Sequence, residues 1–211
     1  MQLCKMKNIK TIIFDLGGVI FNIDYQKTIE EFSKLGISDT KYLYSKNTQS
    51  KLFDDLETGH ISNYEFLKEL QKKSNNANLE QIKKAWNAML LDLPLERLIA
   101  INKVKKKYNI FLLSNTNEIH IHKIKELVGE KTFSEFYNLF DKIYFSFKIK
   151  KRKPNFEAFQ LILFENKLIA NEVLFIDDSI QHINSAKKLN IETLHLKQNQ
   201  EITKILSELV Q

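Results

Sequence analysis

The feature of the sequence that most constrains its fold is a recurrence of short apolar runs with helical stretches between them. Continuous apolar runs of about four to six residues are typical of parallel strands that are buried on both faces of a sheet. The pattern predicts an α/β fold, in which a Rossmann-like parallel sheet carries helices on both faces. The expected strands span residues 9–14, 110–113, 142–147, 173–176 and 193–196.

The interval between the first two expected strands is much longer than one crossover helix needs. About 95 residues separate Phe14 from Ile110, whereas the later strands start roughly 20 to 30 residues apart. Helical spacing of apolar residues and a capping-box pattern at Ser62 to Glu65 predict that this interval is helical. We therefore expect an all-helical cap at residues 23–96, inserted into an α/β core. The core would comprise residues 1–22 and 97–211.

Composition restricts the setting in which the chain works. With 43% apolar and 27% charged residues, it can bury a proper core. The single cysteine, Cys4, cannot form an internal disulfide and is expected to be an inert thiol. The apolar stretch from Ile12 to Phe14 is too short for a membrane span or a signal-peptide core. We expect a cytoplasmic protein without a membrane partner.

The net charge of +6 and the isoelectric point near 9.1 raise the question of nucleic-acid binding. Only Arg97 and Arg152 are arginines among the 32 basic residues. Readers of bases and phosphates favour arginine for its bidentate fork, whereas dispersed lysines usually form a solvated surface. We expect no nucleic-acid partner.

Polar residues follow the expected strands at their carboxyl ends, where open parallel sheets bind ligands. The first strand leads into Asp15-Leu16-Gly17-Gly18, the second into Ser114-Asn115, and the fourth into Asp177-Asp178. Beyond the third strand, Lys153-Pro154 stands at the start of a helix. Carboxylates, a hydroxyl and a lysine at neighbouring strand ends can assemble into one compact site.

These residue types suit phosphoryl transfer assisted by a divalent metal. Asp15 and Asp178 offer the hard oxygen ligands that Mg²⁺ prefers, and a strand-end carbonyl can add a third. Asp15 can attack phosphorus and form an aspartyl phosphate, while Lys153 offsets negative charge. The side chains of Ser114 and Asn115 are expected to donate hydrogen bonds to the phosphate, and the backbone at Gly18 is expected to approach it closely.

Four segments in this order, Phe14 to Ile20, Leu113 to Thr116, Lys153-Pro154 and Phe175 to Asp178, resemble the motifs of the haloacid dehalogenase superfamily of hydrolases. The resemblance covers nearly the whole chain, and the helical interval is similar to the superfamily's helical cap. Four motifs at matching spacings are far more specific than any one of them. Within the superfamily, they look like the branch of bacterial α-glucose-1-phosphate phosphatases and the phosphatase domain of soluble epoxide hydrolases.

The resemblance implies a metal site. Asp15 would be both the nucleophile and a metal ligand, and Asp178 would be the second metal carboxylate. Gly17 would supply a backbone carbonyl ligand, and Asp177 would contact the metal directly or through water. The implied metal is Mg²⁺.

The resemblance also implies a substrate site. Ser114 and Asn115 would hold the phosphoryl group, and Lys153 would be the catalytic lysine of the third motif. The expected activity is a Mg²⁺-dependent phosphatase of a small phosphorylated metabolite, with sugar phosphates as one candidate class.

The sequence departs from the superfamily pattern at Gly17. Most phosphatases of the superfamily carry there a second aspartate, which protonates the leaving group and then activates water. Glycine keeps the carbonyl but not the proton shuttle, so we expect a preference for leaving groups that need little protonation. Asp24, Tyr25 and His60 are possible substitutes by position alone, and Asp24 is the expected N-cap of a helix.

Several other residues have simpler interpretations. His120 and His122 are two apart on an expected helix and would point in different directions, so packing or surface roles are favoured over a metal site. Phe53 and Trp86 are expected in the core of the cap. Arg152 is expected to face solvent.

Two alternative functions stay open. One is a metal-independent 2-haloacid dehalogenase, although adjacent carboxylates at Asp177-Asp178 facing Asp15 would repel without a cation. The other is a catalytically weakened fold that serves as a metabolite-binding or interaction protein. Chelator-sensitive release of phosphate from sugar phosphates would separate all three hypotheses.

Overall fold

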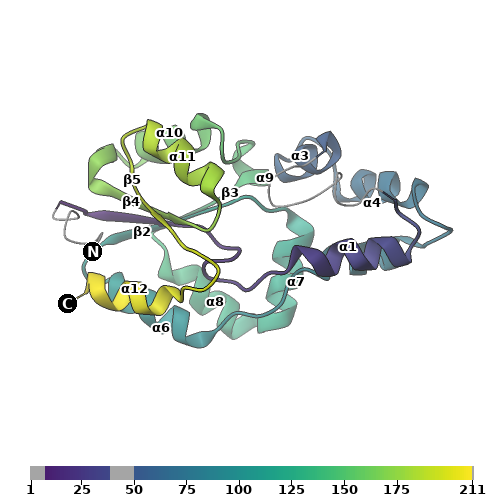
Figure 1. Ribbon diagram of the computed structural model, residues 1–211, viewed down its shortest axis with the longest axis horizontal. Helices are drawn as coiled ribbons and strands as arrows, with labels where there is room; N and C mark the ends of the chain where they lie inside the picture. Colours follow the sequence, from purple (N-terminus) through teal and green to yellow (C-terminus); the bar gives the residue numbers. More distant parts are fainter. Residues whose placement is uncertain (1–7, 39–49, 211) are drawn as a thin grey trace.

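The computed structural model describes residues 8–38 and 50–210 of the chain. Its centre is a five-stranded sheet in which every pair of neighbouring strands is parallel and the strand order is β3-β2-β1-β4-β5. The prediction of a parallel sheet between helices is confirmed (Figure 1). The strands are β1 (Thr11–Phe14), β2 (Asn109–Ser114), β3 (Lys142–Phe145), β4 (Val173–Asp177) and β5 (Glu192–His195).

Two layers of helices cover the sheet (Figure 1). Residues alternate between the two faces along β1, because successive side chains of a strand point to opposite sides. Ile12 and Phe14 join the cluster that includes residues of α6, α8 and α12, whereas Ile13 joins residues of α10 and α11. These helices are α6 (Leu95–Val104), α8 (Glu130–Leu139), α10 (Phe156–Glu165), α11 (Ile180–Lys188) and α12 (Ile202–Leu209).

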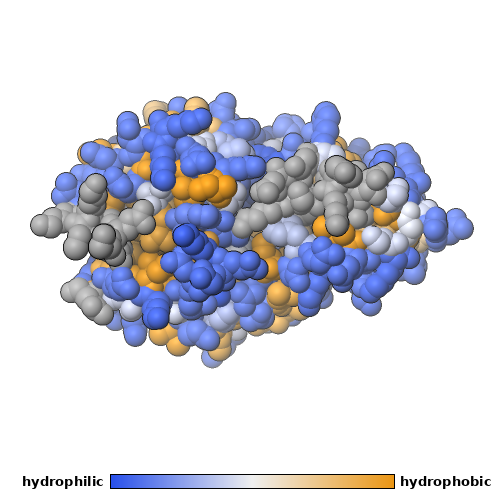
Figure 2. Space-filling model, viewed as in Figure 1, coloured by the Kyte–Doolittle hydropathy of each residue, from blue (hydrophilic) through white to orange (hydrophobic). Residues whose placement is uncertain are grey.

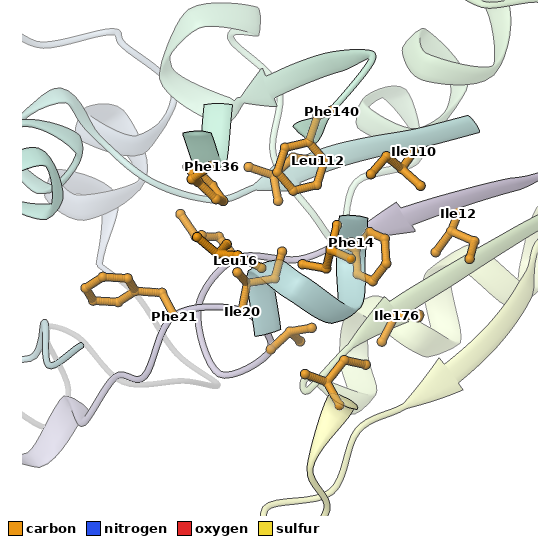
Figure 3. Packing of buried hydrophobic residues seen from close by; sticks show 14 of the residues in the cluster. Ile12, Phe14, Leu16, Ile20, Phe21, Ile110, Leu112, Phe136, Phe140 and Ile176 are labelled. Carbon is orange, nitrogen blue, oxygen red and sulfur yellow. The ribbon is translucent and has the colours of Figure 1, made fainter. Parts of the chain in front are cut away.

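The larger cluster holds the start of the first loop in place. In Figure 3, Phe14, Leu112 and Phe140 gather on one face of the sheet, with Leu16 and Ile20 of the loop beside them. The rings of Phe14 and Phe140 meet edge to face, with 6.4 Å between their centroids. The backbone that follows β1 is therefore fixed by packing on its apolar side.

The described part of the interval between β1 and β2 is mainly helical. It contains α1 (Tyr25–Lys34), α3 (Lys51–Glu57), α4 (Asn63–Lys72), α5 (Leu79–Asn87) and α6. Asp24 and Ser62 cap α1 and α4 as expected. Asn78 caps α5, and the caps at Ser62 and Asn78 are full capping boxes. The helix α3 was not among the expected elements.

A separate aromatic cluster stabilises this interval. Trp86 is fully buried, and its ring lies 5.1 Å from Phe53, 5.5 Å from Phe66 and 4.3 Å from His120, measured between centroids. His120 belongs to α7 (Glu118–Val128), so the cluster also touches the part of the chain that follows β2. The expected core role of Phe53 and Trp86 is confirmed.

Two strand boundaries differ from the expectation by two residues, and those of the second, fourth and fifth strands differ by one residue. The first strand begins at Thr11 rather than at residue 9, and the third ends at Phe145 rather than at residue 147. Ser146 turns the chain because its hydroxyl bonds both the backbone N–H and the carbonyl of Thr116. A short helix, α9 (Ser146–Ile149), starts there.

Hydrophilic side chains are spread widely over the surface. On the face in Figure 2, hydrophilic side chains cover both the sheet half and the helical half, with smaller hydrophobic areas between them. Within residues 8–38 and 50–210, no helix combines the length and apolar character that crossing a bilayer requires. Cys4 lies outside the described residues.

Candidate active site

The register of the sheet brings the polar strand ends together. Phe14 pairs with Leu112 on one side and with Ile176 on the other, so the chain continues into Asp15 beside the ends of β2 and β4. The backbone N–H of Asp15 donates to the carbonyl of Ile176 at 2.9 Å. The predicted meeting of these strand ends at one edge of the sheet is what the structure shows.

Lys153 lies at the centre of this edge. Its ammonium nitrogen donates to Oδ1 of Asp15 and to Oδ2 of Asp177, each at 2.7 Å, and its side chain is fully buried. Burial would lower the pKa of Lys153, but the two carboxylates outweigh it and raise that pKa. A permanently charged lysine therefore joins the carboxyl ends of β1 and β4.

Asn115 fixes the backbone of that lysine. Its side-chain oxygen accepts from the Lys153 N–H at 3.0 Å, and its amide nitrogen donates to the Lys153 carbonyl at 2.8 Å. These two bonds connect the end of β2 to a segment 38 residues further along the chain. The geometry shows Asn115 holding Lys153, and its contact with a phosphoryl group stays a prediction. Ser114 is buried next to it and lines the same pocket.

Three carboxylates share the site. Asp15, Asp177 and Asp178 each place an oxygen so that all three lie within 4.8 Å of one another. Burial raises the pKa of Asp15 to about 7, and the carboxylates of Asp177 and Asp178 add to this effect, which Lys153 opposes. One lysine does not balance three carboxylates, so the donor set fits a divalent cation that takes oxygen ligands.

Asp177 is held in the ionised form. Burial would raise its pKa, but Lys153 and His182 outweigh burial and lower that pKa to about 2. Nδ1 of His182 lies 3.0 Å from both of its oxygens, and the backbone N–H of Ser179 donates to it at 2.7 Å. His182 of α11 was not among the candidate residues, because nothing in its local sequence marks it.

Gly18 is needed where Asp178 approaches the first loop. Its φ is +76°, and a Cβ at this position would lie only 2.4 Å from Oδ2 of Asp178. Its N–H donates to the carbonyl of Phe21 at 2.8 Å, which closes the loop. Glycine tolerates both the left-handed conformation and the close approach, as the expected role of Gly18 requires.

The carboxylates open into a pocket of about 80 Å³ between the sheet edge and the helical interval. The interval and its approach contribute Ile23, Tyr25, Glu57 and Met89 to its lining. Its residues from the sheet edge and the loops nearby include Asp15, Gly17, Ser114, Asn115, Arg152, Lys153, Asp178 and His182.

The structure corrects the expectation for Arg152. Its side chain is 16% exposed and does not simply face solvent. It pairs with Asp54 and with Glu57 of α3, and its Nη2 lies 3.1 Å from Oε2 of Glu57. Glu57 was not a candidate either, because nearly 100 residues separate it from Arg152 in the sequence.

The structure assigns the remaining polar candidates to the interior, to a helix cap or to the surface. His120 is buried and stacked on Trp86, and burial lowers its pKa to about 4, whereas His122 is exposed. The structure thus agrees with the expected packing and surface roles. Asp24 caps α1 by accepting from Gln26 N–H at 2.9 Å, and His60 is exposed outside the pocket.

Comparison with known proteins places this site in a family. Residues 9–190 match the haloacid dehalogenase-like hydrolases. The chain belongs to this family. As a haloacid dehalogenase-like hydrolase it is an enzyme, and the motif resemblance found in the sequence is confirmed.

Individual relatives of this hydrolase span its length. It is 33% identical over 204 residues to a D-ribitol-5-phosphate phosphatase of Bacteroides thetaiotaomicron, which covers 94% of this chain and 99% of the relative. A haloacid dehalogenase family enzyme from the same organism was crystallised, as an aspartate-to-alanine variant, with magnesium and inorganic phosphate. It is 30% identical, with a TM-score of 0.86 over 93% of this chain and 98% of that one.

A third relative is a predicted hydrolase of the family from Porphyromonas gingivalis. It is 27% identical, with a TM-score of 0.84 over 97% of this chain and 98% of that one. Dehalogenase structures are also similar, but at 15% identity and a TM-score of 0.59 they show a shared fold alone.

Proposed function

We propose that this hydrolase is a Mg²⁺-dependent phosphatase of small phosphorylated metabolites, with polyol or sugar phosphates as its substrate class. The observation that carries the proposal is the buried lysine bridge between Asp15 and Asp177, with Asp178 completing a cluster of three carboxylates. The relatives support it, since one is a D-ribitol-5-phosphate phosphatase and another binds magnesium and inorganic phosphate.

The metal ligands in this proposal are the carboxylates of Asp15 and Asp178 and the backbone carbonyl of Gly17, with Asp177 as a direct or water-mediated partner. Bound Mg²⁺ would neutralise charge on the phosphoryl oxygens and on the attacking carboxylate. Asp15 must be ionised to attack, and the positive charge of Lys153 favours that ionised form although burial opposes it.

The reaction then proceeds in two steps on this chain's own residues. A carboxylate oxygen of Asp15 attacks phosphorus, the bond from phosphorus to the leaving oxygen breaks, and an aspartyl phosphate forms. Lys153 offsets the charge that accumulates, and Ser114, Asn115 and Gly18 contact the phosphoryl oxygens. Water then attacks the same phosphorus and releases inorganic phosphate, which restores the carboxylate.

The helical interval supplies the rest of the substrate site in this proposal. We assign residues 23–96 to a cap and residues 1–22 and 97–211 to the hydrolase core. Tyr25 and Glu57 line the pocket from the cap side, so the atoms of the substrate beyond the phosphate would lie against them. A polar pair such as Glu57 and Arg152 suits a substrate rich in hydroxyl groups.

Phosphate release from a panel that includes D-ribitol 5-phosphate, glycerol phosphate and glucose 1-phosphate tests the proposal. We expect activity with Mg²⁺ and its loss in excess EDTA. Asp15→Asn is expected to lower turnover by at least about 10³-fold, as loss of a nucleophile does. Asp24→Asn is the matched control, because asparagine caps a helix as well as aspartate does. Activity that survives EDTA, or that survives in Asp15→Asn, would overturn the proposal.

A further inference from the structure

Gly17 leaves a gap in the proposed chemistry. The alkoxide released from a polyol phosphate is a strong base and needs a proton as the bond to phosphorus breaks. Gly17 has no side chain to supply it. A chain that hydrolyses such substrates therefore needs an acid from elsewhere in the pocket.

An ion pair excludes two of the ionisable residues that line the pocket. Glu57 lies 3.1 Å from the guanidinium of Arg152, so its carboxylate is engaged in an ion pair. Arg152 itself does not lose its proton in proteins. Both are suited to contact hydroxyl groups rather than to transfer a proton.

The two histidines of the pocket are also unsuited. Nε2 of His120 lies 3.2 Å from the Trp86 carbonyl, and because that oxygen only accepts, the nitrogen carries the hydrogen. Burial lowers the pKa of His120 to about 4, so the ring is neutral. Nδ1 of His182 is directed at Asp177, so its hydrogen is already engaged with that carboxylate.

Tyr25 is the remaining candidate, and it lines the pocket from the side of the helical interval. It is the first residue of α1, immediately after its N-cap Asp24, and it packs against the aromatic cluster of the helical interval while it lines the pocket with Asp15 and Asp178. A phenol has an ordinary pKa of about 10, so the hydroxyl of Tyr25 carries its proton at neutral pH.

We propose that the hydroxyl of Tyr25 is the proton donor to the leaving-group oxygen, in place of the acid that Gly17 lacks. The inference rests on the proposed phosphatase activity. As Asp15 bonds to phosphorus, the leaving oxygen departs with the electron pair of its bond and takes the proton of Tyr25. In the second step the tyrosinate recovers a proton from the attacking water, so the residue ends each turnover as it began.

The test compares leaving groups in the Tyr25→Phe variant. p-Nitrophenyl phosphate releases a weakly basic phenolate that needs little protonation, whereas D-ribitol 5-phosphate releases an alkoxide. We expect kcat to fall by about 10²- to 10³-fold on D-ribitol 5-phosphate or glycerol phosphate, the usual effect of losing a general acid, and by less than about tenfold on p-nitrophenyl phosphate. Tyr64→Phe, an exposed tyrosine outside the pocket, is the matched control.

A second variant restores the acid at its usual place. Gly17 does not have a positive φ, and a Cβ there would meet only the flexible end of Ile23 at 2.9 Å. Gly17→Asp combined with Tyr25→Phe should therefore recover at least about tenfold of the lost turnover on alkyl phosphates. Gly17→Ala with Tyr25→Phe is its control and should recover none.

The outcomes are separable. Equal losses on both leaving groups, or no loss on alkyl phosphates, would overturn the role of Tyr25 while leaving the phosphatase proposal intact. Wild-type protein that is inactive on every phosphate ester would instead overturn the phosphatase proposal. Circular dichroism and thermal unfolding identify a variant that fails to fold. If Tyr25→Phe fails to fold, Tyr25→Trp and Tyr25→His are assayed with the same two leaving groups and decide the question.

Discussion

Replacing Gly18 with alanine tests whether the first loop is shaped to receive Asp178. The new Cβ would lie 2.4 Å from Oδ2 and 2.8 Å from Cγ of Asp178, where ordinary contacts begin at 3.4 Å. The carboxylate or the loop must therefore retreat by about 1 Å, the difference between 3.4 and 2.4 Å. A shift of that size exceeds what the octahedral geometry of Mg²⁺ tolerates, and a misplacement of about 1 Å can cost about 10²-fold in rate.

The variant also carries a backbone cost. Gly18 has φ +76°, and an alanine in a sparsely populated region of this kind costs about 1–3 kcal/mol in stability. Gly129→Ala separates the two effects, because Gly129 has φ +79° with no atom within 4 Å of the added Cβ. We expect both variants to lose about 1–3 kcal/mol of unfolding free energy in urea.

Only Gly18→Ala should affect the metal site. Isothermal titration calorimetry is expected to show Mg²⁺ affinity lowered by at least about tenfold, and kcat/KM for phosphate release is expected to fall by about 10²-fold. Gly129→Ala should bind Mg²⁺ as the wild type does. Unchanged Mg²⁺ binding in Gly18→Ala, or an equal loss in Gly129→Ala, would show that Gly18 does not shape the metal site.

Three further predictions concern the charges of the site. Lys153→Met leaves the carboxylates of Asp15 and Asp177 buried without their cation, and it should lower the free energy of unfolding in urea by about 3–5 kcal/mol. The control Lys142→Met breaks an exposed pair with Glu165 and should lower it by less than about 1 kcal/mol. Similar losses in the two variants would contradict this prediction. Because folded Asp15 holds its proton up to about pH 7 while the unfolded chain loses it near the ordinary value of 3.8, metal-free stability should fall as pH rises through that interval. Mg²⁺ must displace this proton, so calorimetry should show binding about tenfold tighter at pH 8 than at pH 6, and equal affinities would count against it.

The sequence determined the sheet and its active edge because both depend on local signals. Apolar runs predict buried strands, and the register of the strands alone places the residues that follow them at the sheet edge. The helix caps at Ser62 and Asn78 were equally readable, since a capping box spans only four residues.

The features that were missed depend on contacts between distant parts of the chain. Arg152 pairs with Asp54 and Glu57 across nearly 100 residues, and the helix that carries those two acids has no capping side-chain bond at Ser50 to mark its start. His182 likewise has meaning only through Asp177, against which α11 places it. Periodicity does not reveal such pairings, because they arise from how the helices pack after they form.

The end of the third strand shows the same limit. The apolar pattern continues to Phe147, but the hydroxyl of Ser146 bonds the backbone of Thr116 and turns the chain into a helix. Thr116 is 30 residues away, so no local rule contains this contact.

Trapping the intermediate shows directly whether Asp15 accepts the phosphoryl group. The enzyme is mixed with Mg²⁺ and D-ribitol 5-phosphate, quenched in acid within the first turnover, and digested for mass spectrometry. A phosphoryl group is expected on the peptide that contains Asp15, located at that residue, and none is expected in the Asp15→Asn variant. A phosphoryl group on another residue, or rapid phosphate release by Asp15→Asn, would contradict this expectation.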